Sequence, residues 1–185
     1  ATEFTLLLDF NTGALNAPGA DLTFNGVGGF SVTFTDDKSG SANGVHITNE
    51  NEGNIKVGNP TDFVLGTPDG LHSSGIVANF SQGVTGVRFF DTDDDATGKT
   101  LFAFDQFGTL IGQDGNGPFT VEPNIQPGDA QRIFAIDTSG TGGQLIWSIE
   151  FDTQVGVAGG ANDGTYFTID NFETTYSIAA PVPLS

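Results

Sequence analysis

The chain has 185 residues and a formal net charge of −18, with 5 Lys and Arg residues against 23 Asp and Glu residues. This balance argues against nucleic-acid binding and against attachment to an anionic membrane, because both interactions depend on Lys and Arg. The chain contains no Cys, which excludes disulfide bonds and thiolate metal sites.

Short segments of alternating apolar and polar residues predict β-strands along the whole chain. In residues 3–10, Phe4, Leu6 and Leu8 fall on one face, which is the pattern of a half-buried strand. The 27 Gly and 8 Pro residues separate such segments as turns. Further strands are expected at residues 29–35, 45–48, 54–57, 62–65, 75–80, 84–91, 99–105, 109–112, 131–137, 144–152 and 165–176.

Two pairs of these segments are expected to form hairpins. Residues 99–105 and 109–112 are joined by a turn with Gly at the position that suits a left-handed backbone. Residues 131–137 and 144–152 are expected to pair across the Gly-rich segment 138–143. No stretch shows a useful length of helical periodicity. The sequence therefore predicts an all-β fold, an antiparallel β-sandwich of the jelly-roll type with little or no helix.

The aromatic residues are mostly Phe, which carries no polar atom and therefore belongs in the core. Trp147 shares a predicted strand face with Leu145 and Ile149, so we expect Trp147 in the core rather than in a sugar-stacking platform. Tyr166 and Tyr176 are the aromatic residues that we expect at the surface.

One β-sandwich domain is expected over residues 1–177, followed by a Pro-containing tail over 178–185. The chain contains no Met, which indicates a processed start, and Ala1 fits the small residue that follows a signal-peptidase cut. No apolar run is long enough to span a bilayer. We therefore expect a secreted or cell-surface protein.

A carboxylate inside the last predicted strand points to a metal ion. Alternation places Asp170 on the same face as Phe172, where its charge is costly unless a partner neutralises it. Ca²⁺ is the simplest neutraliser in a chain so rich in carboxylates. If the first and last strands are neighbours, Asp9 and Asn11 would share this ion with Asp170. The alternative is that Asp9 faces water and Asp170 accepts local hydrogen bonds in a turn.

A second candidate calcium site is the acidic loop 91–98. Asp91, Asp93 and Asp95 alternate there and can point their oxygens at one hard cation. The loop is not an EF-hand, because Ala96 replaces the turn Gly and Phe102 stands at the position of the closing Glu. The alternative is a solvated acidic turn.

Catalytic patterns are incomplete in this sequence. The segment Glu150-Phe151-Asp152 matches half of the Glu-x-Asp-x-x-Glu signature of sandwich glucanases, but Val155 stands at the third acidic position. No Gly-x-Ser-x-Gly elbow exists, and His46 and His72 lack the spacing of zinc ligands. We therefore expect no enzymatic activity.

Three segments carry a family resemblance: VTGVRFFD at 84–91, LFAFDQFG at 101–108 and FTIDNF at 167–172. Together they resemble exported bacterial surface proteins of the PEP-CTERM type. The tail APVPL at 180–184 is similar to the Val-Pro-Leu-Pro-Ala variant of their sorting signal, with Ser185 in place of its second Pro. The resemblance implies exosortase processing and an association with cell envelopes, biofilm matrix or exopolysaccharide.

Asp9-Phe10-Asn11 and Ile169-Asp170-Asn171 carry a second resemblance. They are similar to calcium-bearing lectin-like and carbohydrate-binding jelly rolls, in which an acidic residue near the first strand and an Asp in the last strand share a structural ion. Asn11 stands where an acid is usual. This resemblance implies a structural Ca²⁺ held by residues of both end strands.

These features predict a non-catalytic, calcium-stabilised β-sandwich that acts as a structural or adhesive protein at the cell surface or in extracellular matrix. Self-assembly into filaments would proceed by strand exchange, with the apolar first strand as the donor. The alternative function is a calcium-dependent carbohydrate-binding module. The expected partners are therefore further copies of the chain or an extracellular polysaccharide.

Overall fold

The computed structural model describes residues 1–11, 20–36, 44–48, 64–66, 75–92, 99–115, 119–120, 131–152 and 167–180. Helical structure in these ranges is limited to the short 3₁₀ turn Val27–Gly29, and they contain no helix with the length and hydropathy of a membrane span. The strands are β1 (Thr2–Leu8), β2 (Leu22–Asn25), β3 (Ser31–Asp36), β4 (His46–Thr48), β5 (Val64–Gly66), β6 (Ile76–Asp91), β7 (Thr100–Phe104), β8 (Leu110–Gly115), β9 (Phe119–Thr120), β10 (Gln131–Asp137), β11 (Ile146–Asp152) and β12 (Thr168–Ile178).

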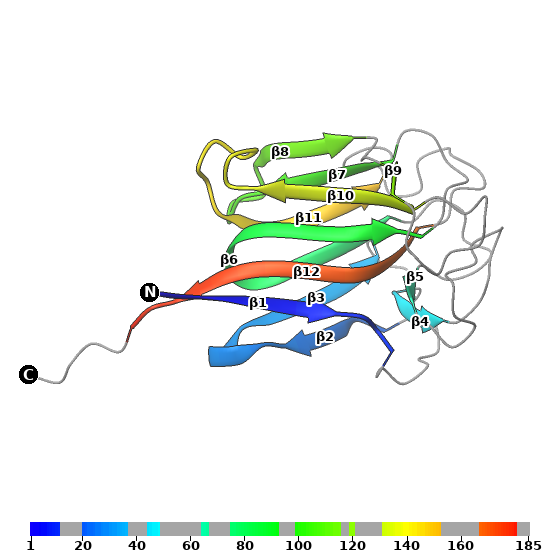
Figure 1. The fold of residues 1–185 in the computed structure, drawn as a ribbon, viewed down its shortest axis with the longest axis horizontal. Coiled ribbons are helices and arrows are strands. Elements are labelled where there is room, and N and C mark those ends of the chain that lie inside the picture. Colours follow the sequence, from blue (N-terminus) through cyan, green and yellow to red (C-terminus); the bar gives the residue numbers. More distant parts are fainter. Residues whose placement is uncertain are drawn as a thin grey trace, which may run out of the picture.

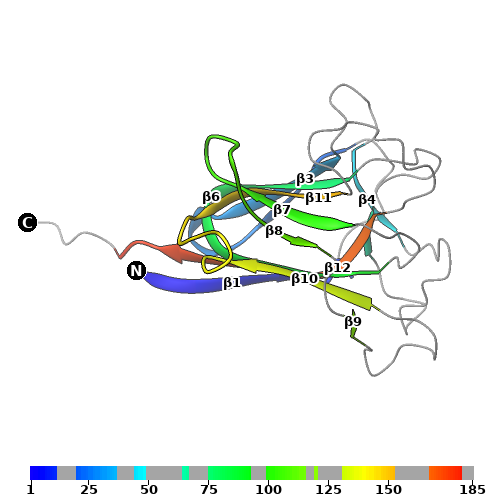
Figure 2. The same ribbon diagram turned by 90° about the horizontal axis from the view of Figure 1, so that it is seen from above.

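The strands form two stacked layers, seen edge-on in Figure 2. One layer has the order β2-β3-β6-β11-β7-β8, and the other has the order β1-β12-β6-β10-β9, with β4 and β5 continuing along the β1 side of β12. Every described strand pair is antiparallel. The predicted all-β antiparallel sandwich is confirmed.

The long strand β6 belongs to both layers. Residues 76–80 pair with β3 and β11, and residues 86–91 pair with β10 and β12. Two separate strands were expected here, at 75–80 and 84–91. At the bend, a Cβ atom on Gly83 would lie 2.8 Å from the Cβ of Leu145. The missing side chain therefore allows β6 to approach the start of β11 closely as it passes between the layers.

The segment 138–143 connects the two layers instead of closing a hairpin. β10 pairs with β6 and β9, whereas β11 pairs with β6 and β7, so the predicted pairing of 131–137 with 144–152 is wrong. The other predicted hairpin is confirmed, because β7 pairs with β8 and Gly108 adopts a φ of 78° in their turn. Alternation identifies a strand, but it does not specify the layer that the strand joins.

Phenylalanine rings fill the space between the layers, as the composition predicted. Phe172 is fully buried, and its ring centroid lies 4.9 Å from Phe34 and 6.2 Å from Phe89. Phe151 packs edge-on against Phe89 at 4.9 Å. Phe107 departs from this pattern, because 82% of its surface is exposed.

The first and last strands are hydrogen-bonded neighbours (Figure 1). β12 pairs with β5 at Thr168 and Ile169, and with β1 from Phe172 to Ile178. Between these neighbours lies a bulge at Asn171, which has a φ of 47°. The bulge places both Ile169 and Phe172 in the core. Asp170 therefore does not share the face of Phe172, contrary to the strict alternation assumed from sequence.

Candidate functional site

Strands β3, β6 and β11 terminate on one side of the sandwich (Figure 1), and buried carboxylates lie at or near these strand ends and near the start of β12. None of them is more than 8% exposed, and Lys99 is the one buried cation among the described residues. The five acidic residues are Asp36, Asp91, Glu150, Asp152 and Asp170. Each of these five side chains has an interaction partner in the structure, which lowers the cost of burying its charge.

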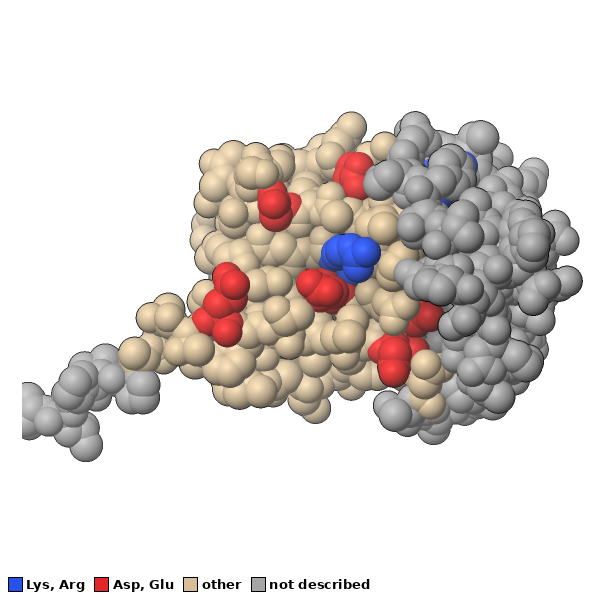
Figure 3. Space-filling view, in the orientation of Figure 1, with Lys and Arg blue, Asp and Glu red and all other residues tan. Residues whose placement is uncertain are grey.

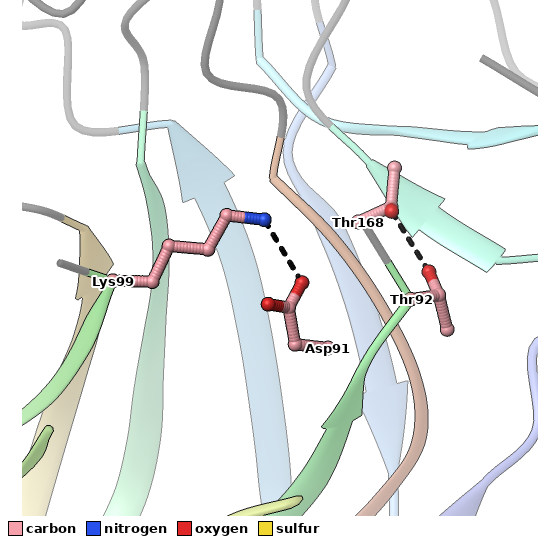
Figure 4. Close-up of polar contacts among 4 residues, drawn as sticks. All are labelled: Asp91, Thr92, Lys99 and Thr168. Carbon is pink, nitrogen blue, oxygen red and sulfur yellow. Dashed lines mark hydrogen bonds and ion pairs between the residues drawn. The ribbon is translucent and has the colours of Figure 1, made fainter. Parts of the chain in front are cut away.

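Asp91 forms a buried ion pair with Lys99 (Figure 4). The Nζ–Oδ1 distance is 3.0 Å, and the Lys99 side chain is 0% exposed. Lys99 Nζ also lies 5.3 Å from the ring centroid of Phe167, within the range of a cation–π contact. Lys99 thus neutralises the carboxylate of Asp91, for which the sequence predicted a calcium ion.

The strand ends beside this ion pair are joined by threonines. The Thr92 N–H donates to the Thr168 carbonyl at 3.0 Å, and their side-chain Oγ1 atoms are 2.8 Å apart (Figure 4). Ile169 lies opposite Asp91, and Asp170 lies opposite Phe90. Residues directly opposite each other share a face, so Asp91 and Asp170 lie on opposite faces of this layer and are not brought together.

Asp9 and Asp170 both accept local hydrogen bonds. The exposed Asp9 accepts the Asn11 N–H through Oδ1 at 3.1 Å, and the buried Asp170 accepts the Asn171 N–H through Oδ1 at 2.7 Å. These are the local bonds that the alternative to a metal site predicts. The register places Leu8 opposite Phe172, so Asp9 follows β1 close to the bulge of β12.

No described residues form a group of three or more His, Cys, Asp or Glu side chains that could hold a metal ion. Asp93 and Asp95 lie outside the described residues. Calcium binding by Asp9, Asn11, Asp91, Asp93, Asp95 and Asp170 therefore stays a prediction.

A second candidate site lies at the opposite end of β11. It is an open groove of about 340 Å³ between the β7–β8 turn and the start of β11. We call it the Trp147 groove. Its lining residues are Asp105, Gln106, Phe107, Gln144, Leu145 and Trp147.

The β7–β8 turn forms one wall of the Trp147 groove and is fixed by Asp105. Asp105 Oδ1 accepts the backbone N–H groups of Phe107 at 2.9 Å and Thr109 at 2.8 Å. The Gly108 N–H donates to the Asp105 carbonyl at 3.1 Å, with Gly108 in the left-handed conformation that glycine adopts without strain. This network fixes the turn that carries the exposed side chain of Phe107.

The segment 138–144 supports the other wall. Asp137 Oδ1 accepts bonds from the Ser139 hydroxyl at 2.6 Å, the Ser139 N–H at 2.9 Å and the Gly140 N–H at 3.2 Å. These bonds, that from the Ser139 hydroxyl first, lower the pKa of Asp137 because they stabilise the carboxylate. The Thr141 hydroxyl donates to the Gln144 carbonyl at 2.6 Å, which fixes the backbone at the groove.

Trp147 lies half-buried in this groove, so the prediction that it belongs to the core is wrong. A register shift between Ile146 and Ser148 interrupts the alternation, and Ile146 and Ile149 are buried instead. The sequence contains a signal for this outcome, because apolar residues at both 145 and 146 allow either phase of alternation.

The surface prediction for tyrosine is also wrong at Tyr176. This residue is 1% exposed, and its hydroxyl accepts the Val27 N–H at 2.9 Å. Tyr166 lies outside the described residues.

Comparison with known proteins adds no assignment to either site. No protein-family model matches the chain, and a search of curated proteins gives no match.

Proposed function

We propose that the chain is a non-catalytic, secreted or surface-exposed β-sandwich that acts as a structural or adhesive protein and assembles by exchanging β1 between copies. The observation that carries this proposal is the position of β1. Among the described strands it pairs with β12 alone, at the edge of its layer (Figure 1).

The contacts of β1 suit an exchangeable strand. All seven residues pair in register with β12, from Thr2 opposite Ile178 to Leu8 opposite Phe172. The side chains of Phe4, Leu6 and Leu8 pack against the core but stay half-buried. The β1 strand of a second copy would therefore form the same backbone hydrogen bonds and fill the same three side-chain positions. Exchange would replace the contacts within one copy by equivalent contacts between copies.

The negative charge of the chain favours association through the exchange of β1 over non-specific association. Acidic side chains outnumber basic ones among the described residues on the face that carries β1 (Figure 3). With a net charge of −18, copies repel one another unless a specific contact or a cation offsets the repulsion.

Calcium is part of this proposal as the ion that offsets that charge. The net charge of −18 supports a role for a cation in the folded or assembled protein. The ligands predicted from sequence are Asp9, Asn11, Asp91, Asp93, Asp95 and Asp170. Carboxylate and amide oxygens are the donors that Ca²⁺ prefers.

A disulfide lock on β1 tests the exchange. Thr5 and Thr175 are register partners, Thr5 is exposed, and the natural sequence has no Cys. Antiparallel partners lie within the Cα separation that a disulfide needs. We expect T5C/T175C to assemble in calcium when reduced, but to stay monomeric in light scattering when oxidised before calcium is added. Assembly of the oxidised protein to the wild-type extent would overturn the proposal, with T5C alone as the control for oxidation.

A further inference from the structure

The Trp147 groove brings together two of the five exposed large hydrophobic side chains among the described residues. Phe107 is 82% exposed and Leu145 is 46% exposed, and both line the groove with Trp147. These side chains come from two segments about 40 positions apart in the sequence, so the fold brings them together. Exposed aromatic surface at a rigid location is typical of a binding site.

The polar groups of the groove have the chemistry of sugar recognition. Gln106 and Gln144 are exposed, and each carboxamide both donates and accepts hydrogen bonds, as a sugar hydroxyl does. An aromatic ring offers a flat face to the C–H groups on one side of a pyranose ring. Two amides beside aromatic rings therefore match a ligand with alternating apolar faces and hydroxyl edges.

The charges around the groove select the class of sugar. None of the described residues that line it is a cation, and Asp105 adds a carboxylate. Acidic polysaccharides would be repelled, and so would a second copy of a chain with a net charge of −18. The open shape leaves room for a chain to continue beyond the lining residues. The ligand that fits is a short stretch within a neutral polysaccharide.

We propose that the Trp147 groove is a carbohydrate-binding site for neutral polysaccharides. Both walls are turns that side-chain hydrogen bonds already fix, through Asp105 on one side and Thr141 on the other. Such a preorganised surface loses little conformational entropy when it binds. The site uses no residue of β1, so binding does not depend on strand exchange.

Trp147 is the single Trp of the chain, which makes its fluorescence a direct reporter. The intact protein would be titrated with laminarin, hydroxyethylcellulose, dextran and mannan, with alginate as the acidic comparison. We expect a shift of Trp emission and slower migration in affinity electrophoresis with at least one neutral polymer. Binding should weaken about tenfold in F107A and in Q144A, because each variant loses a stacking or hydrogen-bonding contact.

V27A is the matched control, because Val27 is 59% exposed and does not line the groove. It should bind as the wild type does. F107A changes an exposed side chain, so its melting temperature should stay at the wild-type value. Failure of all four neutral polymers to bind, preferential binding of alginate, or unchanged binding in F107A and Q144A would overturn the proposal. Assembly of the oxidised T5C/T175C variant would overturn strand exchange but not carbohydrate binding in the Trp147 groove. The two proposals can therefore be refuted independently.

Discussion

Replacing Lys99 with Met tests how the fold neutralises the buried carboxylate of Asp91. Lys99 is 0% exposed, and its Nζ lies 3.0 Å from Asp91 Oδ1. Met preserves most of the apolar stem and its contacts with the neighbouring Phe rings, so the substitution chiefly removes the charge. The carboxylate would then stay at a buried position without its ion-pair partner.

The geometry gives the size of the effect. Two unit charges 3.0 Å apart attract by about 5 kcal/mol at an effective dielectric constant of about 20. Measured losses on removing one partner of a buried pair are about 3–5 kcal/mol. For a chain of this size, about 2–4 °C of melting temperature corresponds to each kcal/mol, so K99M should melt roughly 6–20 °C below the wild type.

Urea unfolding of the wild type, K99M, D91L and the double variant D91L/K99M closes a double-mutant cycle. We expect the double variant to lie within about 1–2 kcal/mol of the wild type, because an apolar pair replaces the buried ions. A loss of less than about 1 kcal/mol in K99M would refute the assignment of Lys99 as the neutralising partner. If calcium neutralised Asp91 instead, K99M would lose stability only after chelation, so the cycle is measured with calcium and with EDTA.

Three further predictions concern calcium binding, Asp170 and Asp137. Chelation with EDTA should lower the melting temperature, since calcium at about 100 times its Kd would stabilise the folded state by about 2.7 kcal/mol; an unchanged melting temperature would contradict calcium binding. In D170A the free energy of unfolding should fall by about 1–3 kcal/mol, because the Asn171 N–H loses its acceptor. In D9A, at an exposed position, it should fall by less than about 0.5 kcal/mol. Equal losses in the two variants would count against a structural role for Asp170. The pKa of Asp137 lies below its ordinary value of 3.8, so the stability that its turn contributes is complete above that pH and is lost as pH falls through the folded-state pKa. NMR titration of S139A should show this pKa moving up towards 3.8, and an unchanged value would remove the Ser139 hydroxyl as its main cause.

Alternation in the sequence identified the positions of most described strands, because the two faces of each strand meet different surroundings. It placed β1, β7, β10 and β12 within a few residues of their observed bounds. It missed β2 at Leu22–Asn25 and treated β6 as two strands. The continuity of β6 depends on partners that change along its length, and a local pattern contains no information about those partners.

The sites were harder to predict because bulges decide which way their side chains point. The pairing of β11 with β6 shifts register at Trp147, which lies in the groove, and the bulge at Asn171 separates Asp170 from the face of Phe172. A register shift of one residue turns every subsequent side chain to the other face of the sheet. A strand can therefore be predicted at the correct position while its side chains are assigned to the wrong face. The ion pair joins Asp91 at the end of β6 to Lys99 just before β7, a contact that sequence spacing alone does not reveal.

The most direct test of strand exchange mixes two single-cysteine variants, T5C and T175C. Neither variant can form a disulfide between positions 5 and 175 within one chain, because each carries only one Cys. After assembly in calcium and oxidation, exchange predicts disulfide-linked pairs in which mass spectrometry of the digested sample finds residue 5 of one copy joined to residue 175 of another. The same mixture oxidised without calcium should contain no linkage between residue 5 and residue 175. Assemblies that form normally but contain no such linkage would contradict the account.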